Sequence, residues 1–325
     1  MKAEKDLFLA VDIGGTKIAV GLIDNDGHIL AYNQDQTCQI SPKEGIRQII
    51  NMLESLVDQQ RIQIETVTAI GIGIPAVLEP ESDYVIWAPN LNNWRNVDLK
   101  GALATYFKLP VYIEYDGHAA VLGEWWVGAG RTYHTLVDII IGTGVGGGMI
   151  LDGKLFRGNN RLAGAAGWFG PSTCIGQQDE RPLTNGYWES HVSGPAVTVR
   201  AKKLARVNED SAIVRLATEE RLSSITLFAA AKQGDQAAQK LCNQVADEIG
   251  SGIANVVSMI NPQLVILGGG LGSNCAFLLP RIRKFVDHWA QPFSAQSVEI
   301  VISALGSQAG LLGAAYAAIL RSAED

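Results

Sequence analysis

Short apolar runs separated by glycine-containing turns dominate the beginning of the chain. The segment from Leu7 to Asp24 reads as an apolar strand, a turn at Gly14-Gly15-Thr16 and a second strand from Ile18 to Ile23. The tripeptide Asn25-Asp26-Gly27 then predicts a turn into a third strand, His28 to Gln34. The pattern therefore predicts a three-stranded meander.

The same order of elements returns about 130 residues later, which indicates an internal repeat of architecture. Leu136 to Ile141 reads as an apolar strand, Gly142-Thr143-Gly144 as a turn, and Gly147 to Leu151 as a second strand. Asp152-Gly153 leads into a third short strand, Lys154 to Phe156. Two equivalent meanders are expected.

Helical spacing follows the first meander. Apolar residues recur every three or four positions between Ser41 and Gln60, where Ser41 can cap the helix and Pro42 can occupy its first turn. The remaining predicted elements are strands at Thr68–Ile74, Val111–Glu114 and Leu264–Leu267, and helices at Asp116–Gly128, Ser193–Ala205, Ile225–Lys232, Ala237–Ile260 and Ala309–Arg321.

Two copies of a meander followed by helices predict an α/β protein of two related lobes, with a central cleft between the lobes as the expected ligand site. We expect residues 1–120 to form the N-terminal lobe, completed by the closing helix at 309–325. Residues 121–308 would form the C-terminal lobe. The length of 325 residues is enough for two cores.

Composition narrows the classes of partner. Lys and Arg number 26 against 33 Asp and Glu, a net charge of −7, which argues against general attraction to nucleic acid or anionic lipid. The uncharged stretch from Glu248 to Arg281 is broken at Asn261-Pro262 and by three glycines from Gly268, so no transmembrane span is predicted. The first apolar run reaches Asp12 too soon for a signal peptide, and a cytoplasmic protein is expected.

The turn after the first strand has the composition of an anion site. In Asp12-Ile-Gly-Gly-Thr-Lys17, the backbone N–H groups of Gly14 and Gly15 can point at an anion, Thr16 can donate its hydroxyl, and Asp12 can hold Mg²⁺ through water. A plain hairpin turn is the alternative interpretation.

The equivalent turn of the second meander, which contains Thr143 and Gly144, favours the anion site, because two such turns could grip a polyphosphate from both sides of a cleft. Gly142, Gly144 and Gly147 also fit the dinucleotide-binding pattern GxGxxG. That motif needs a helix after its glycines, whereas strand-forming residues follow here.

Three further segments are candidates for chemistry. Gly268-Gly269-Gly270 follows a strand and could lie flat against an adenine or a ribose, or could simply connect a strand to a helix. Asp116 opens a helix after a strand, as an N-cap or as a catalytic base. The loop from Ala88 to Trp94 combines amides with an indole, which suits a sugar, although a solvated loop would look the same.

These motifs together resemble the ROK family of sugar kinases and sugar-responsive regulators, within the actin-like ATPase superfold of duplicated ribonuclease H-like lobes. The resemblance runs from Asp12 nearly to the C-terminus and implies ATP and Mg²⁺ as cofactors. It implies a base at Asp116, sugar contacts at Asn90 and Glu189, ATP contacts at the motif residues and a homodimer or higher homo-oligomer. The motif residues are Asp12, Gly14, Gly15, Thr16, Lys17, Thr143, Gly144, Gly268 and Gly269.

The chain also departs from the family pattern. Trp168 stands where the family has a sugar-binding Glu, Pro171 where it has a His, and Tyr115 where an Asn commonly precedes the catalytic Asp. Of the family's zinc cluster only Cys174 remains, and one thiol cannot form a four-ligand site, so no structural zinc is expected. Each lost polar contact would cost about 1–3 kcal/mol.

Two functions remain open on this basis. The first is an ATP-dependent kinase for a hydroxyl of a sugar or sugar derivative, with an altered sugar pocket that includes Trp168. The second is a sensor of sugar or nucleotide without catalysis. A DNA-binding repressor is not expected, because only about six residues precede the first strand, too few for a helix-turn-helix.

Overall fold

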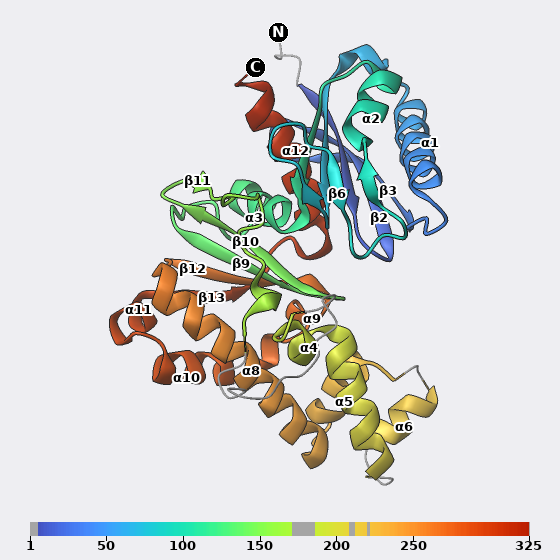
Figure 1. The fold of residues 1–325 in the computed structure, drawn as a ribbon. Coiled ribbons are helices and arrows are strands. Elements are labelled where there is room, and N and C mark those ends of the chain that lie inside the picture. The colour runs from blue at the N-terminus through green and yellow to red at the C-terminus, as the bar shows by residue number, and fades with distance from the viewer. Residues whose placement is uncertain (1–5, 171–185, 208–211, 220–221, 325) are drawn as a thin grey trace. The chain divides into compact units, whose positions relative to one another are not determined.

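A computed structural model describes residues 6–170, 186–207, 212–219 and 222–324 of the chain. Its larger strands form two five-stranded sheets with the same internal order (Figure 1). The first sheet contains, in spatial order, β3 (Ile29–Gln36), β2 (Lys17–Asp24), β1 (Leu7–Ile13), β4 (Val67–Ile74) and β8 (Val111–Tyr115). The second contains β11 (Lys154–Leu155), β10 (Val145–Leu151), β9 (Leu136–Ile141), β12 (Leu264–Gly268) and β13 (Glu299–Ile302).

A small third sheet and the helices complete the chain. The third sheet consists of β5 (Val77–Leu78), β6 (Val85–Trp87) and β7 (Arg95–Val97). The helices are α1 (Pro42–Gln60), α2 (Leu99–Phe107), α3 (Asp116–Val127), α4 (Glu189–Val192), α5 (Gly194–Val207), α6 (Ala212–Glu219), α7 (Ser224–Lys232), α8 (Gln236–Ile260), α9 (Gly269–Gly272), α10 (Leu279–Trp289), α11 (Pro292–Ser297) and α12 (Ala309–Ser322). Short 3₁₀ turns are η1 (Ile64–Thr66), η2 (Ala166–Trp168), η3 (Ala276–Leu278) and η4 (Gly306–Gln308).

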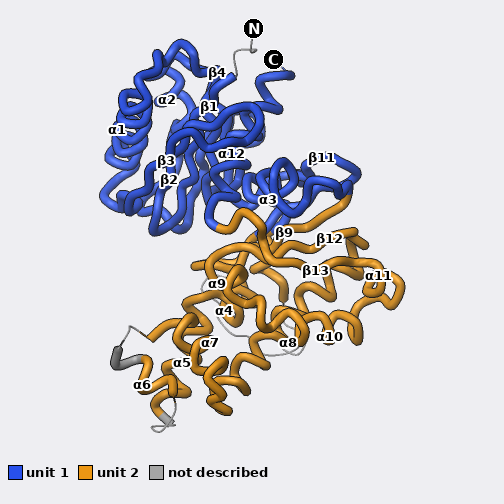
Figure 2. Tube along the Cα trace, turned by 180° about the vertical axis from the view of Figure 1, so that it is seen from behind, with its two compact units in different colours: residues 1–134, 147–164, 307–325 blue, residues 135–146, 165–306 orange. Residues whose placement is uncertain are grey.

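The chain divides into two compact units (Figure 2). Unit 1 comprises residues 1–134, 147–164 and 307–325, and unit 2 comprises residues 135–146 and 165–306. The sequence placed one boundary near residue 120. In the structure, α3 groups with unit 1 because glycines bring it against α12: a Cβ on Gly313 would lie 1.5 Å from the carbonyl oxygen of Ala119, and one on Gly123 would lie 2.3 Å from that of Ala309.

The core of unit 1 forms because β1, β2, β4 and β8 are buried on both faces, whereas β3 at the edge is mostly exposed. β1 pairs antiparallel with β2 and parallel with β4, which pairs parallel with β8. Helices α1 and α2 cover one face of this sheet, and α3 and α12 cover the other (Figure 1). Burial of Leu53 and Leu56 from α1 contributes about 1.5–3 kcal/mol for each side chain, and the Ser41 hydroxyl caps this helix at Glu44 N–H.

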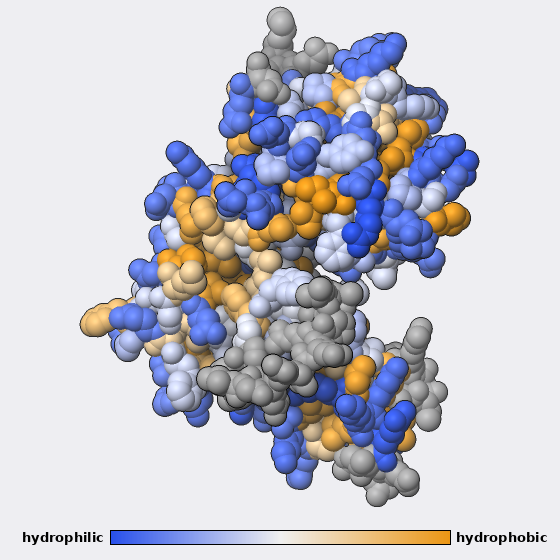
Figure 3. Space-filling model, viewed as in Figure 1, coloured by the Kyte–Doolittle hydropathy of each residue, from blue (hydrophilic) through white to orange (hydrophobic). Residues whose placement is uncertain are grey.

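The parallel strands determine where polar groups gather. Asp12 lies opposite Gly73 in the register of β1 and β4, and Gly73 lies opposite Glu114 in the register of β4 and β8. The carboxyl ends of these three strands therefore form one edge of the sheet, where open α/β sheets usually bind ligands. Charged and apolar residues are interspersed on the face of the molecule drawn in Figure 3.

Candidate functional site

Asp12 occupies a space that two glycines leave open in unit 1. A Cβ on Gly310 would lie 2.7 Å from one carboxylate oxygen of Asp12, and a Cβ on Gly73 would lie 3.6 Å from the other. Burial, and to a smaller extent the negative charge of Asp116, raises the pKa of Asp12 to about 7. Such a carboxylate would be stabilised by a cation.

Asp116 follows β8 at the same edge of the sheet and is the first residue of α3. Its Oδ1 accepts a hydrogen bond of 2.8 Å from Gly117 N–H. Burial raises the pKa of Asp116 to about 6, against the lowering effect of that N–H group. Asp116 thus has the location of a helix-terminal residue and the pKa of a group that can take up a proton near neutral pH.

The glycine turn of unit 1 is held by its carbonyl groups. The hydroxyl of Thr37 donates to Gly14 O at 2.7 Å, and the side-chain amide of Gln39 donates to Gly15 O at 2.7 Å. In a trans peptide the carbonyl and the following N–H point in opposite directions, so the N–H groups of Gly15 and Thr16 point away from these two side chains. Within the described part of the chain no acceptor is recorded for either N–H. The turn therefore presents two donors to an anion, but Gly14 N–H, which the sequence also assigned to the anion, donates to Lys17 O at 2.8 Å instead.

The loop that carries Asn90, the predicted contact to the sugar, lies next to this turn. A Cβ on Gly15 would lie 3.1 Å from Asn90 Cβ, so the glycine allows the loop to approach the turn. A cavity of about 390 Å³ is lined by Gln39 and residues 87–95, among them Asn90. A solvated loop would leave Trp94 half-buried, but Trp94 is only 3% exposed and packs against Gly45 of α1. This tryptophan anchors the loop, while Asn90 stays exposed.

A buried ionic network lies behind Asp116. Burial alone would raise the pKa of Glu114, but His118, Arg157 and Arg161 lower it to about 2. Arg157 donates two hydrogen bonds to Glu114 Oε1, of 3.0 and 2.6 Å, and Arg161 pairs with the buried Asp83. The network fixes β8 just before the candidate base.

The glycine turn of unit 2 is supported by a carboxylate. Glu189, at the start of α4, accepts a hydrogen bond of 2.8 Å from Val145 N–H through Oε2. The same oxygen would lie 2.8 Å from a Cβ on Gly144. Gly144 is therefore required sterically by Glu189, which the sequence assigned only to the sugar. The strand β10 follows these glycines, which excludes a Rossmann turn because that motif opens a helix.

The remaining predicted residues of unit 2 lie in segments close to this turn: a Cβ on Gly142 would lie 3.9 Å from Gly270 N, and one on Gly167 would lie 3.2 Å from Glu189 Cβ. Gly268 ends β12, and Gly269 begins α9 with φ of 78°, a left-handed value that favours glycine. A Cβ on Gly269 would also lie 2.6 Å from Ile141 O, so this turn packs closely against β9. Trp168 ends η2 and is 54% exposed, where it can contact a ligand.

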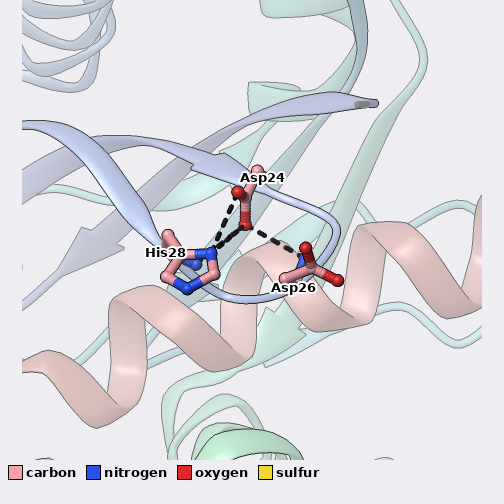
Figure 4. Close-up of side chains that lie close together, drawn as sticks. All are labelled: Asp24, Asp26 and His28. Atoms are coloured by element: carbon pink, nitrogen blue, oxygen red, sulfur yellow. Dashed lines mark hydrogen bonds and ion pairs between the residues drawn. The ribbon is translucent and has the colours of Figure 1, made fainter. Parts of the chain in front are cut away.

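The expected absence of zinc depends on Cys174, which lies outside the described residues, as does Pro171, the predicted change in the sugar pocket. Within the described residues, Asp24, Asp26 and His28 form a group whose ligand-type atoms lie within 4.8 Å of one another (Figure 4). Asp24 Oδ1 accepts from the N–H groups of Asp26, at 3.0 Å, and His28, at 2.9 Å, so this carboxylate shapes the turn from β2 to β3.

Comparison with known proteins identifies the family of this chain. Residues 8–321 match the ROK family. The chain belongs to the ROK family. A ROK glucokinase from Streptomyces griseus, solved in complex with glucose and AMPPNP, superposes with a TM-score of 0.80 at 30% identity, covering 95% of this chain and 98% of that one. This likeness and the matching sheet orders confirm the expected actin-like, two-lobed α/β fold.

Named relatives in the ROK family include both enzymes and regulators. The glucokinase of Thermotoga maritima is 32% identical over 314 residues, which cover 94% of this chain and 95% of the relative. A xylose repressor of Caldicellulosiruptor bescii is 30% identical over 319 residues, covering 96% of this chain and 78% of the repressor. Among the described residues, no helix has both the length and the apolar character of a membrane span.

Sequence reasoning missed Thr37, Gln39 and the network around Glu114. Glu114 ends the strand predicted just before Asp116, and a carboxylate at that position was a usable signal. Its partner Arg157 is 43 positions away, and Gln39 is 24 positions from Gly15. Pairings at such separations leave no periodic pattern in the sequence.

Proposed function

We propose that this ROK protein is an ATP-dependent kinase that phosphorylates a hydroxyl group of a sugar or sugar derivative. The observation that carries the proposal is the pair of carboxylates, Asp12 and Asp116, whose pKa values are raised to about 7 and about 6 at one edge of the first sheet. The AMPPNP and glucose complex of the Streptomyces griseus relative supports the choice of nucleotide and of substrate class.

In this proposal Asp116 accepts the proton of the attacking hydroxyl. A pKa near 6 leaves the carboxylate ionised at neutral pH yet basic enough to take up that proton. The Gly15 and Thr16 N–H groups hold a phosphate, and Lys17, Thr143, Gly144, Gly268 and Gly269 complete the contacts to ATP.

Asp12 would hold Mg²⁺ through water, and its raised pKa supports this because a nearby cation would stabilise the ionised form. When bound, Mg²⁺ neutralises the charge that develops on the phosphates during transfer. Phosphoryl transfer otherwise depends mainly on positioning, which the rigid ends of β1 and β8 can supply.

The substrate would differ from the usual hexose of the family. Asn90 and Glu189 are retained as sugar contacts, whereas Trp168 offers an aromatic face in place of a carboxylate. An aromatic face can stack on the apolar side of a sugar or of an aglycone but cannot accept a hydroxyl proton.

A panel of hexoses, pentoses, amino sugars and sugar acids, each incubated with ATP and Mg²⁺, tests the proposal through sugar-dependent release of ADP. We expect turnover with at least one sugar, and its loss in Asp116→Asn. A protein that binds a sugar by calorimetry but transfers no phosphate to any member of the panel would instead be a sensor, a function that the relationship to xylose repressors favours.

A further inference from the structure

The segment Thr37–Gln39, which we call the brace, joins the glycine turn of unit 1 to the loop that carries Asn90. It follows β3 and precedes α1. Its first residue donates twice to the turn: Thr37 Oγ1 donates to Gly14 O at 2.7 Å, and Thr37 N–H donates to Thr16 O at 3.1 Å. Its last residue, Gln39, contacts both the turn and the loop.

Gln39 makes three hydrogen bonds, one to the turn and two to the loop. Its side-chain Nε2 donates to Gly15 O at 2.7 Å, and its side-chain Oε1 accepts from Asn92 N–H at 3.0 Å. Its backbone carbonyl accepts from Asn92 Nδ2 at 2.9 Å. One amide side chain thus connects the turn to a loop residue two positions from Asn90, and each of its two polar atoms has one partner.

The brace is itself fixed by the first helix. Gln48 of α1 accepts a hydrogen bond from Cys38 N–H at 2.9 Å and donates to Gln36 O at 2.7 Å. Trp94 of the loop packs against Gly45 of the same helix. The brace and the loop therefore share one rigid support, and a change in the turn can reach the loop through Gln39.

We propose that Gln39 is a positioning residue that couples the phosphate-binding turn to the acceptor loop, so that a nucleotide on the turn orders residues 88–94. The bond to Gly15 O keeps the peptide plane in which Thr16 N–H points away from the brace. The bonds to Asn92 hold the loop close to that turn. This inference rests on the proposed kinase function for the meaning of the two ligands, but its structural part concerns AMPPNP alone.

Hydrogen exchange of the full chain, with and without saturating AMPPNP and Mg²⁺, tests the coupling without turnover. In the unmodified protein, AMPPNP should slow exchange in residues 88–94. In Gln39→Ala this protection of the loop should be lost although the nucleotide still binds. Gln59→Ala on α1 is the matched control, because it removes the same side chain and one exposed hydrogen bond, to Ser55 Oγ at 3.0 Å.

A second variant separates the contact of Gln39 with the turn from its contacts with the loop. Gln39→Glu keeps an acceptor for Asn92 N–H but places a carboxylate oxygen against Gly15 O. It should raise the KM for ATP by about three- to tenfold, as the loss of one hydrogen bond predicts, while the KM for the sugar stays close to that of the unmodified protein. Gln39→Ala should raise both constants. A role in stability alone would lower the melting temperature and leave both KM values unchanged.

The outcomes distinguish the two proposals. Sugar phosphorylation with no nucleotide-dependent protection of the loop, or with equal protection in Gln39→Ala, overturns the coupling and leaves the kinase intact. Protection that depends on Gln39, with no sugar phosphorylated, overturns the kinase and leaves the coupling. A chain that does not bind AMPPNP overturns both.

Discussion

The carboxylate of Asp12 should destabilise the protein when no cation is bound, and Asp12→Asn tests this. The substitution removes the charge with almost no change in size. Size matters here because Gly73 and Gly310 leave little space around the carboxylate. We therefore expect Asp12→Asn to stabilise the magnesium-free protein above neutral pH.

The magnitude follows from the pKa. The pKa of Asp12 rises from 3.8 to about 7 on folding, so between these values the folded chain binds more protons than the unfolded chain. Stability then falls as the pH rises through this range, and the full cost is present above about pH 7. At about 1.36 kcal/mol per pKa unit the upper bound is about 4 kcal/mol, and relaxation of this partly exposed group should reduce it to about 1–3 kcal/mol.

Thermal unfolding of the magnesium-free protein from pH 4 to pH 8 measures this effect. The melting temperature of Asp12→Asn should exceed that of the unmodified protein at pH 8 and approach it at pH 4, where the native carboxyl is protonated. Asp6→Asn, which removes an exposed charge from the same unit, is the control. Equal gains at pH 4 and pH 8, or a gain no larger than that of Asp6→Asn, would refute the reasoning.

Four further predictions follow from the site. Asp116→Asn should lower kcat by about 10²- to 10⁴-fold with little change in nucleotide affinity, and unchanged turnover would mean that Asp116 only begins a helix. In the unmodified protein, kcat/KM should fall as the pH drops below about 6, because the base must be ionised. Gly144→Val should abolish nucleotide binding measured by calorimetry, because its side chain would fill the space that the phosphate needs; normal ATP affinity would contradict this. Elemental analysis of untreated protein should find no stoichiometric zinc, and about one zinc per chain would overturn the prediction. Trp168→Glu should weaken the native reaction without creating strong glucose activity. Efficient phosphorylation of glucose by the unmodified protein, with kcat/KM of about 10⁴ M⁻¹s⁻¹ or above, would refute the prediction of an altered substrate.

The elements that the sequence predicted correctly are those with strong periodicity. The strand at Leu136–Ile141 has the same bounds in the structure, and the helix expected between Ser41 and Gln60 begins one residue after its Ser41 cap. Among the described residues, six helices were missed: Leu99–Phe107, Glu189–Val192, Ala212–Glu219, Gly269–Gly272, Leu279–Trp289 and Pro292–Ser297. The first is only nine residues long and is apolar on most sides, so it shows little contrast between its faces.

The candidate site was predictable only where it is local. Asp12 and Asp116 could be found because each carboxylate lies at the carboxyl end of an apolar strand, Asp12 one residue before the end of β1 and Asp116 directly after β8. Strand ends determine which groups share an edge. The bond between Gln39 and Asn92 spans 53 positions, and that between Asp83 and Arg161 spans 78. Such pairs depend on how the sheet is folded, and no local propensity encodes them.

The two glycine turns show why a duplicated architecture need not duplicate a site. Both follow the strand at the centre of a five-stranded sheet of the same order. In unit 1, however, the turn carbonyls of Gly14 and Gly15 accept from side chains, whereas in unit 2 Gly142 O accepts from Gly194 N–H and Val145 N–H donates to the carboxylate of Glu189. The first arrangement leaves the N–H groups of Gly15 and Thr16 without a recorded acceptor among the described residues. In the second arrangement, Glu189 already accepts a hydrogen bond from Val145 N–H and places a negative charge beside the turn. An anion is therefore favoured at the first turn, and at the second turn it is disfavoured unless a cation or a movement of Glu189 compensates.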